Sequence, residues 1–255
     1  MNKKRTIVCG DIHGAHKALV QCLERSNFNK DEDTLIQLGD VCDGWSEVYE
    51  CVEELLSIKN LICIKGNHDE WFHAFLRSPN GMHPDQWIQG GEGTLKSYTK
   101  KLGFGYGGTK YHGFHTGMHC SDIPESHLNF FLNQKLYYKD KDNNLFIHGG
   151  FNRHYTLEEQ FHHIFYWDRD LFYAAMAAKS TKQSLKFKEE FNKIYIGHTE
   201  VTHWGESTPI FADKVVNMDT GAGFKGKLTF MDIATNEIWQ SDLSKELYPD
   251  EKGRN

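Results

Sequence analysis

Five stretches of this sequence place a side chain that can bind a metal ion beside a glycine, directly after a short apolar run. The first is residues 9–14, where Asp11 and His13 lie two residues apart and follow the apolar and β-branched run 6–9. The other four bring Asp40, Asn67 with His68 and Asp69, His148, and His198. One Asp and one His near a turn usually only cap a helix, but five repetitions are poorly explained by chance. The pattern indicates a site built from the ends of several strands.

The ligand types suit two metal ions better than one. Six side chains supply oxygen or nitrogen: Asp11, His13, Asp40, Asn67, His148 and His198. Six ligands are too many for one ion that keeps an open position, but they suffice for two. Two cations about 3.5 to 4 Å apart need a shared anionic ligand, and Asp40, after the second strand, is the candidate. Such a pair can activate water and hold phosphoryl oxygens, so the expected reaction is hydrolysis by in-line attack.

The chemistry of the ligands also narrows the metal. The set contains carboxylate, amide and imidazole groups but no thiolate. This favours Mn²⁺, with Fe or Zn²⁺ as alternatives, over a closed structural zinc site.

The elements that must position these ligands alternate between strand and helix. Residues 15–25 and 47–59 carry apolar side chains at helical spacing, between strand-like runs at 6–9, 34–38 and 61–65. Such alternation predicts parallel strands joined by right-handed crossover helices. Further helices are expected at 69–76 and 122–132. A strand ending at His148 follows, and after Arg153 a largely helical stretch is expected to run to residue 192. Three short runs, at 215–218, 227–233 and 237–240, are expected to form an antiparallel section.

Length and composition are those of one globular domain spanning residues 1–255. Hydrophobic residues make up 39% and charged residues 25% of the chain, and no Pro/Ser-rich linker divides it. Residues 78–119, rich in glycine, are expected to be an inserted loop and helix segment that covers part of the site. Residues 241–255 are expected to be a tail. No oligomer is predicted.

Charge and cysteine usage restrict location and partners. The net charge of −6 argues against a general nucleic-acid binder. The positive residues 3–5 are followed by too few apolar residues for a signal peptide, and no run is long enough to span a membrane. The six cysteines include no Cys-x-x-Cys pair, which favours reduced thiols. We expect a cytoplasmic protein without membrane contact.

At this point the motifs show a family resemblance. Residues 10–14, 39–43, 66–69, 148–150 and 197–199 resemble, in order, the motifs of the calcineurin-like metallophosphoesterases. Within that superfamily the pattern is most similar to the bacterial and phage serine/threonine phosphoprotein phosphatases, over residues 5 to about 233. The resemblance implies an α/β fold, a two-sheet sandwich of mixed strands flanked by helices, with the site at the carboxyl ends of the strands.

The resemblance also implies roles. Asp11, His13 and Asp40 would bind the first metal ion, and Asp40, Asn67, His148 and His198 the second. His68 would protonate the leaving oxygen, while Asp43 would orient His68 and favour its protonated form. Asn67, Arg153 and Arg169 are candidates for binding the substrate phosphate. Gly44 stands where the phosphoprotein phosphatase pattern usually has an arginine, so a bidentate guanidinium contact is missing there.

Three functions stay open. The first is a phosphomonoesterase of the serine/threonine protein phosphatase type, acting on a phosphorylated protein or a small phosphate ester. The second is a dinucleoside polyphosphate or other nucleotide hydrolase. The third is a non-catalytic scaffold, which the presence of all six ligands together with His68 and Asp43 disfavours.

Overall fold

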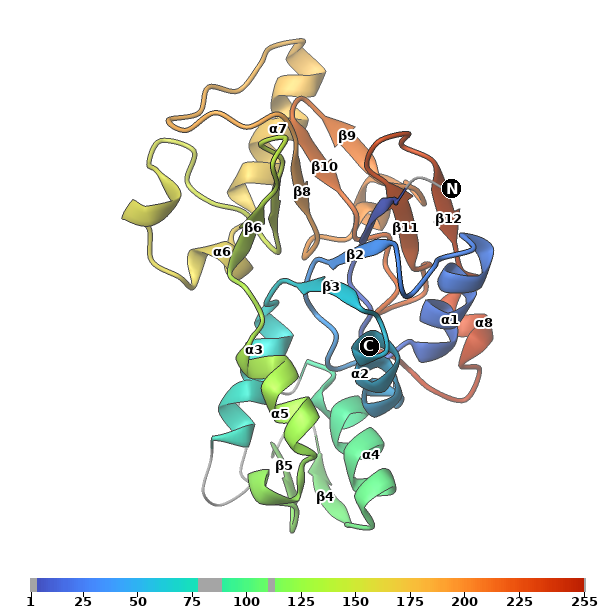
Figure 1. Ribbon diagram of the computed structural model, residues 1–255. Helices are drawn as coiled ribbons and strands as arrows, with labels where there is room; N and C mark the ends of the chain where they lie inside the picture. The colour runs from blue at the N-terminus through green and yellow to red at the C-terminus, as the bar shows by residue number, and fades with distance from the viewer. Residues whose placement is uncertain (1–3, 78–88, 110–112, 255) are drawn as a thin grey trace.

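Two five-stranded sheets form the centre of the molecule (Figure 1). The computed structural model describes residues 4–77, 89–109 and 113–254. The first sheet has the order β12-β11-β1-β2-β3, made of β1 (Thr6–Cys9), β2 (Thr34–Gln37), β3 (Asn60–Cys63), β11 (Thr229–Asp232) and β12 (Ile238–Gln240). The second has the order β6-β7-β8-β10-β9, made of β6 (Tyr137–Lys139), β7 (Leu145–Ile147), β8 (Ile194–Ile196), β9 (Ile210–Ala212) and β10 (Val215–Asn217).

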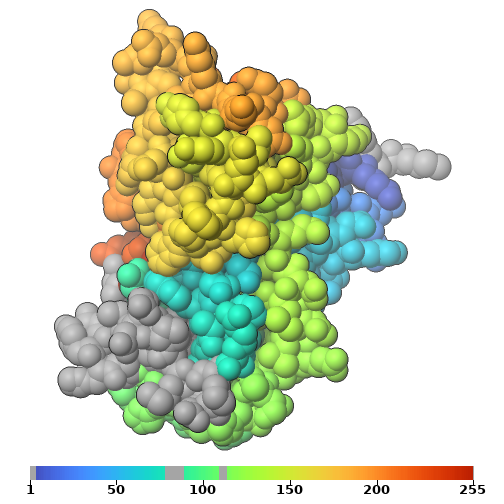
Figure 2. Space-filling model, turned by 90° about the vertical axis from the view of Figure 1, so that its left-hand side faces the viewer, coloured from blue at the N-terminus to red at the C-terminus, as the bar shows by residue number. Residues whose placement is uncertain are grey.

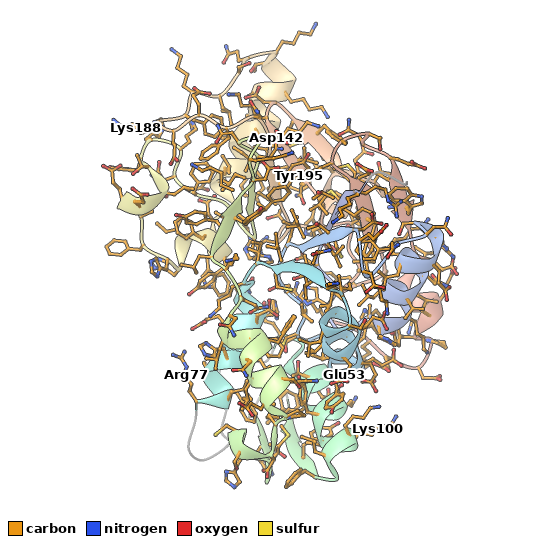
Figure 3. The ribbon with its side chains drawn as sticks, viewed as in Figure 1. Glu53, Arg77, Lys100, Asp142, Lys188 and Tyr195 are labelled. Atoms are coloured by element: carbon orange, nitrogen blue, oxygen red, sulfur yellow. The ribbon has the colours of Figure 1, made fainter. Side chains whose placement is uncertain are left out.

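The side chains of the inner strands alternate between two cores, because successive residues of a strand point to opposite faces. In β1, Val8 packs into the core between the sheets, whereas Ile7 and Cys9 face the helices outside. Tyr195 of β8 meets this central core from the second sheet and is fully buried (Figure 3). The two sheets therefore pack face to face, as the predicted sandwich requires.

Helices cover the outer faces of both sheets. Apolar side chains of α1 (His16–Arg25) and α2 (Val48–Leu56) share a core with Ile7 and Leu35 of the first sheet. On the second sheet, α7 (Asp170–Thr181) packs with Leu145 and Ile194. The other helices of the described residues are α3 (Asn67–Leu76), α4 (Gly91–Leu102), α5 (Glu125–Leu132), α6 (Ile164–Trp167) and α8 (Ser244–Leu247). Short 3₁₀ turns lie at Cys120–Asp122, Leu157–Glu159 and Val201–Trp204.

The predicted parallel opening is correct, since β1, β2 and β3 pair in parallel. The predicted antiparallel section is only partly correct. Strands β11 and β12 do pair antiparallel beside β1, but β10 lies in the second sheet, parallel to β8 and antiparallel to β9, a strand that the sequence did not predict. Residues 183–192 carry no regular helix, because α7 ends at Thr181 and Lys182 turns left-handed.

The segment 78–119 was predicted as an insertion, and 78–88 and 110–112 lie outside the described residues. The rest forms α4 and the hairpin of β4 (Tyr106–Thr109) and β5 (Gly113–Thr116). Figure 1 shows α4, α5 and this hairpin together at the end of the molecule that lies away from the second sheet. In the space-filling view α3 lies directly beneath the segment that contains α6 and α7 (Figure 2). No helix among the described residues is long and apolar enough to cross a bilayer.

Candidate active site

The six candidate ligands converge where the carboxyl ends of strands from the two sheets meet. Asp11, His13, Asp40 and Asn67 follow β1, β2 and β3, whereas His148 and His198 follow β7 and β8 of the other sheet. The backbone N–H of His198 donates to Asp11 Oδ2 at 3.1 Å, although 187 positions separate the two residues. The site therefore joins the two sheets.

Short distances link the ligands in a chain that has Asp40 at its centre. The Oδ2 atom of Asp40 lies 3.5 Å from His13 Nε2 and 3.3 Å from His148 Nε2. His13 Nε2 is 3.9 Å from Asp11 Oδ2, and His148 Nε2 is 3.2 Å from Asn67 Oδ1. Asp40 also belongs to both clusters of potential ligand atoms, one with His13 and His68, the other with His148 and His198. This is the place that a bridging carboxylate would occupy.

Left-handed backbone conformations aim these side chains into the site. His13, Asp40, Asp43 and His198 have φ values of 50°, 57°, 69° and 66°. Few residues other than glycine adopt such angles, and His and Asp are among those that do. The chain therefore turns sharply after β1, β2 and β8, where it delivers His13, Asp40 and His198, a form of local strain that gathers at functional sites.

Two glycines let carboxylates approach the backbone closely. A Cβ added at Gly66 would lie 2.0 Å from Asp40 Oδ1, and one at Gly197 would lie 2.0 Å from Asp11 Oδ1. Any side chain at these positions would displace a candidate ligand. The glycines beside the metal-capable residues are thus part of the site's construction.

The hydrogen-bonding pattern directs potential ligand atoms toward the centre of the site. His13 and His148 use Nδ1 to donate to the carbonyl oxygens of Cys42 and Leu38, both at 2.8 Å, which turns Nε2 inward. In the described part of the chain, Asp40 Oδ2 and His198 Nε2 are buried without any hydrogen-bond partner. Buried polar atoms are rarely left unsatisfied, and a metal ion would satisfy both. The residues present therefore fit a two-metal site.

The electrostatics of the site also favour cations. Burial would raise the pKa of Asp40, but the neighbouring His148 and His68 hold it well below its usual range. Burial opposes the charge of His148, yet the carboxylates of Asp40 and Asp11 raise the pKa of His148 to about 9. Burial and the nearby Asp219 raise the pKa of Asp11 well above its usual range. The carboxylates of the site thus stabilise nearby positive charge, which divalent cations would also supply.

His68 and Asp43 form a buried pair beside the ligands. His68 Nδ1 donates to Asp43 Oδ2 at 2.6 Å, and Thr94 Oγ1 donates to the other carboxylate oxygen at 2.7 Å. The Nε2 atom of His68 is buried without a partner. Burial and the charge of Arg254 lower the pKa of His68 well below its usual range. The bond to Asp43 fixes the orientation of the His68 ring, while burial opposes its protonated form.

Asp69 shapes the loop that carries Asp40 and Asp43, a role that the sequence did not reveal. Its carboxylate accepts backbone N–H bonds from Asp40, Val41, Cys42 and Gly66 at 2.9 to 3.1 Å, and one from the amide of Gln134 at 2.9 Å. Asp69 thus fixes the loop at residues 40–42 against Gly66 at the start of α3.

Asp219 and Arg254 were also missed. Asp219 is buried two residues after β10, and burial raises its pKa to about 6. The run 215–219 repeats the strand-then-acid pattern of the other motifs, so the pattern itself was a usable signal. Arg254 places Nη1 3.2 Å from His13 Nε2, and nothing in its local sequence indicated this.

The two candidate phosphate-binding arginines differ in position. Arg169 donates through Nη1 to the carbonyl oxygen of His198 and to Thr199 Oγ1, both at 2.7 Å, so it borders the site. Arg153 instead lines a separate cavity of about 210 Å³ with Asp168 and Asp170. Among the described residues, no contact links Arg153 to a candidate ligand.

An aromatic surface adjoins the ligands. Trp167 is 41% exposed, and its ring lies 5.9 Å from the ring of His198 and 5.4 Å from that of Trp71. Part of the Trp167 indole is therefore open to solvent beside a candidate ligand.

Fold and site together define a class of metal-dependent enzymes that cleave phosphate esters. A family model described as calcineurin-like phosphoesterase matches residues 4–214. The chain therefore belongs to the calcineurin-like phosphoesterases, as its five motifs predicted, and is an enzyme of that class.

Relatives divide between two kinds of substrate. A symmetrical bis(5'-nucleosyl)-tetraphosphatase of Pseudomonas entomophila is 38% identical over 65 residues, 25% of this chain and 23% of that protein. One from Coxiella burnetii is 24% identical over 116 residues, 39% of each protein. A serine/threonine-protein phosphatase 2 of Salmonella typhimurium is 40% identical over 62 residues, 24% of this chain and 28% of that protein. The chain thus matches less than half the length of each of these relatives.

Solved structures resemble the whole fold. A protein described as a candidate diadenosine tetraphosphatase has a TM-score of 0.62 at 15% identity, covering 93% of this chain and 92% of that one. A serine/threonine phosphatase of Saccharomyces cerevisiae has a TM-score of 0.55 at 14% identity, covering 98% and 83%. At such identities the likeness shows the fold alone, which is the predicted two-sheet sandwich.

Proposed function

We propose that this enzyme hydrolyses dinucleoside polyphosphates at a two-metal centre formed by Asp11, His13, Asp40, Asn67, His148 and His198. The observation that carries hydrolysis is Asp40 Oδ2, buried without a hydrogen bond between the inward nitrogens of His13 and His148. Two bound divalent ions, Mn²⁺ in this proposal, would supply the activation of water and neutralise phosphoryl charge. The proposal includes a cytoplasmic location, which the six free cysteines support.

The chain's own residues would bind the phosphoryl group and protonate the leaving oxygen. Arg169, held against His198 and Thr199, has guanidinium nitrogens left to contact a phosphoryl oxygen. His68, oriented by Asp43, would protonate the leaving oxygen through Nε2. For this step His68 must be charged, and the negative charge of a bound phosphate beside Arg254 would favour that state.

The choice of substrate rests on two supports. Symmetrical bis(5'-nucleosyl)-tetraphosphatases recur among the relatives. Trp167, 41% exposed beside His198, would offer a stacking surface for a nucleobase. A phosphorylated protein is the second candidate, favoured by the 62-residue match to a serine/threonine-protein phosphatase.

A substrate panel tests the proposal. Diadenosine tetraphosphate, a phosphoserine peptide and nitrophenyl phosphate would be compared with Mn²⁺, using Asp40→Asn as the inactive reference. We expect the highest kcat/KM on the dinucleotide, and we expect Trp167→Ala to raise KM for it about tenfold through lost stacking, with little effect on the peptide. Highest kcat/KM on the peptide would favour the second candidate. Turnover no higher than that of Asp40→Asn on every substrate would refute phosphoester hydrolysis at this centre.

A further inference from the structure

We propose that Arg254 is a phosphate-binding residue of this site, placed by a distant segment in the space that Gly44 leaves open. The proposal rests on the proposed hydrolysis of phosphate esters and adds the residue that holds the phosphoryl group. Three features of the molecule support it: residues 248–254 are anchored beside the site, the Arg254 guanidinium lies next to His13, and glycines leave space for the arginine stem.

The segment 248–254 is fixed onto the loop that follows Asp43. The Tyr248 ring stacks on Trp45 with a centroid distance of 5.0 Å, and its hydroxyl bonds to Glu47. The Glu251 carboxylate accepts bonds from both the backbone N–H and the hydroxyl of Ser46, at 3.0 and 2.7 Å. Arg254 itself donates its backbone N–H to Gly223 at 3.0 Å. These contacts hold the arginine at the site.

The Arg254 guanidinium lies among the candidate ligands. Its Nη1 is 3.2 Å from His13 Nε2, and its Cζ lies 4.8 Å from the centre of the Phe224 ring. Its Nε is buried and has no hydrogen-bond partner within the part of the chain that the structure describes. A guanidinium with donors still to satisfy, held beside a two-metal centre, matches the paired oxygens of a phosphoryl group.

Glycines make the room that the arginine stem fills. A Cβ added at Gly44 would lie 3.3 Å from Arg254 Cγ, and one added at Gly90 would lie 3.2 Å from the same atom. A long side chain at position 44 and Arg254 therefore compete for one space. The space that Gly44 leaves open in place of an arginine is thus occupied by the stem of Arg254.

A competing interpretation follows from the same distance. Because His13 Nε2 is the atom that would bind a metal ion, Arg254 could instead substitute for that ion and oppose metal binding. The two roles differ in what removal of the guanidinium changes, so measurements of phosphate affinity and of metal affinity separate them.

The experiment compares wild type, Arg254→Ala and Arg254→Lys, each loaded with Mn²⁺. Arg25→Ala is the matched control, because Arg25 lies at the far end of α1 and pairs with Asp242 on the surface. Calorimetry would measure the affinity for inorganic phosphate, elemental analysis the bound Mn²⁺, and circular dichroism the fold. We expect Arg254→Ala to weaken phosphate binding about tenfold to a hundredfold, Arg254→Lys to weaken it less, and Arg25→Ala to leave it unchanged, all with unaltered metal content.

Two results would overturn the proposal. One is unchanged phosphate affinity in a folded Arg254→Ala protein. The other is tighter Mn²⁺ binding with unchanged phosphate affinity, which would make Arg254 a competitor of the metal. Failure of the proposed function is recognised separately, as wild-type protein that turns over no phosphate ester, whatever the phosphate affinity of the Arg254 variants.

Discussion

At the scale of single residues, His68 is the position at which proton transfer can be tested separately from metal binding. Its Nδ1 is committed to Asp43, and its buried Nε2 is free to act. It also lies within one of the two clusters of potential ligand atoms, with His13 and Asp40. The ring could therefore serve as an acid or as a ligand, and substitution distinguishes these roles.

We expect His68→Asn to bind the same number of Mn²⁺ ions as wild type but to turn over slowly. General acid catalysis is typically worth about 10² to 10⁴-fold, and the loss should shrink when the leaving group needs no proton. The loss of kcat should therefore be larger on a phosphoserine peptide than on nitrophenyl phosphate, with Asp43→Asn showing the same order more weakly. Equal losses on both substrates, or a missing metal ion, would make His68 a ligand or a structural residue.

At the scale of elements, the loop after β2 depends on a residue at the start of α3. Asp69 holds that loop through three backbone N–H groups, at residues 40–42, and accepts a fourth from Gly66, and all four are buried. Removing its carboxylate leaves these donors without a partner, and each unsatisfied buried donor costs about 1 to 3 kcal/mol.

We expect Asp69→Ala to lower the free energy of unfolding by about 3 kcal/mol or more, and to weaken Mn²⁺ binding because Asp40 loses its position. Urea unfolding of the metal-free protein measures the first effect and metal titration the second. Asp31→Ala, at an exposed turn that keeps its backbone bond to Asn29, should change neither. A loss of stability no larger than that of the control would show that the loop holds its shape without Asp69.

The sequence could predict features that lie within one element, but not those that depend on contacts between elements. Asp11, Asp40 and His198 were predictable because each belongs to a local pattern of strand, glycine and ligand. The roles of Asp69 and Arg254 were not, because they depend on contacts between segments far apart in the chain. The placement of β10 beside β8 was unpredictable for the same reason, since strand pairing is not encoded by local alternation.

At the scale of the whole molecule, the candidate ligands tie the two sheets together. His148 and His198 come from one sheet, and Asp11, His13, Asp40 and Asn67 from the other. A ligand that binds only the folded protein stabilises it, by about 2.7 kcal/mol at a hundredfold excess over Kd.

We expect saturating Mn²⁺ to raise the Tm of the chelator-treated protein by about 5 to 10 °C, and Ca²⁺ to raise it less, because histidine ligands suit the transition metal better. Asp40→Asn, which weakens both sites, should show almost no rise. Scanning calorimetry measures all three, with activity followed in parallel. An equal rise in Asp40→Asn would place the bound ions elsewhere.

The position of β11 beside β1 has a consequence for biosynthesis. β1 is made first among the strands, yet it becomes an interior strand only when β11, residues 229–232, pairs along its other edge. At about 5 to 20 residues per second, roughly 10 to 45 s separate the translation of these two strands. Asp11 also needs the backbone of His198, which comes late. We therefore expect a nascent chain to carry its acidic motifs for much of its synthesis without the geometry that they have in the folded protein, and to reach that geometry only after translation has passed residue 232.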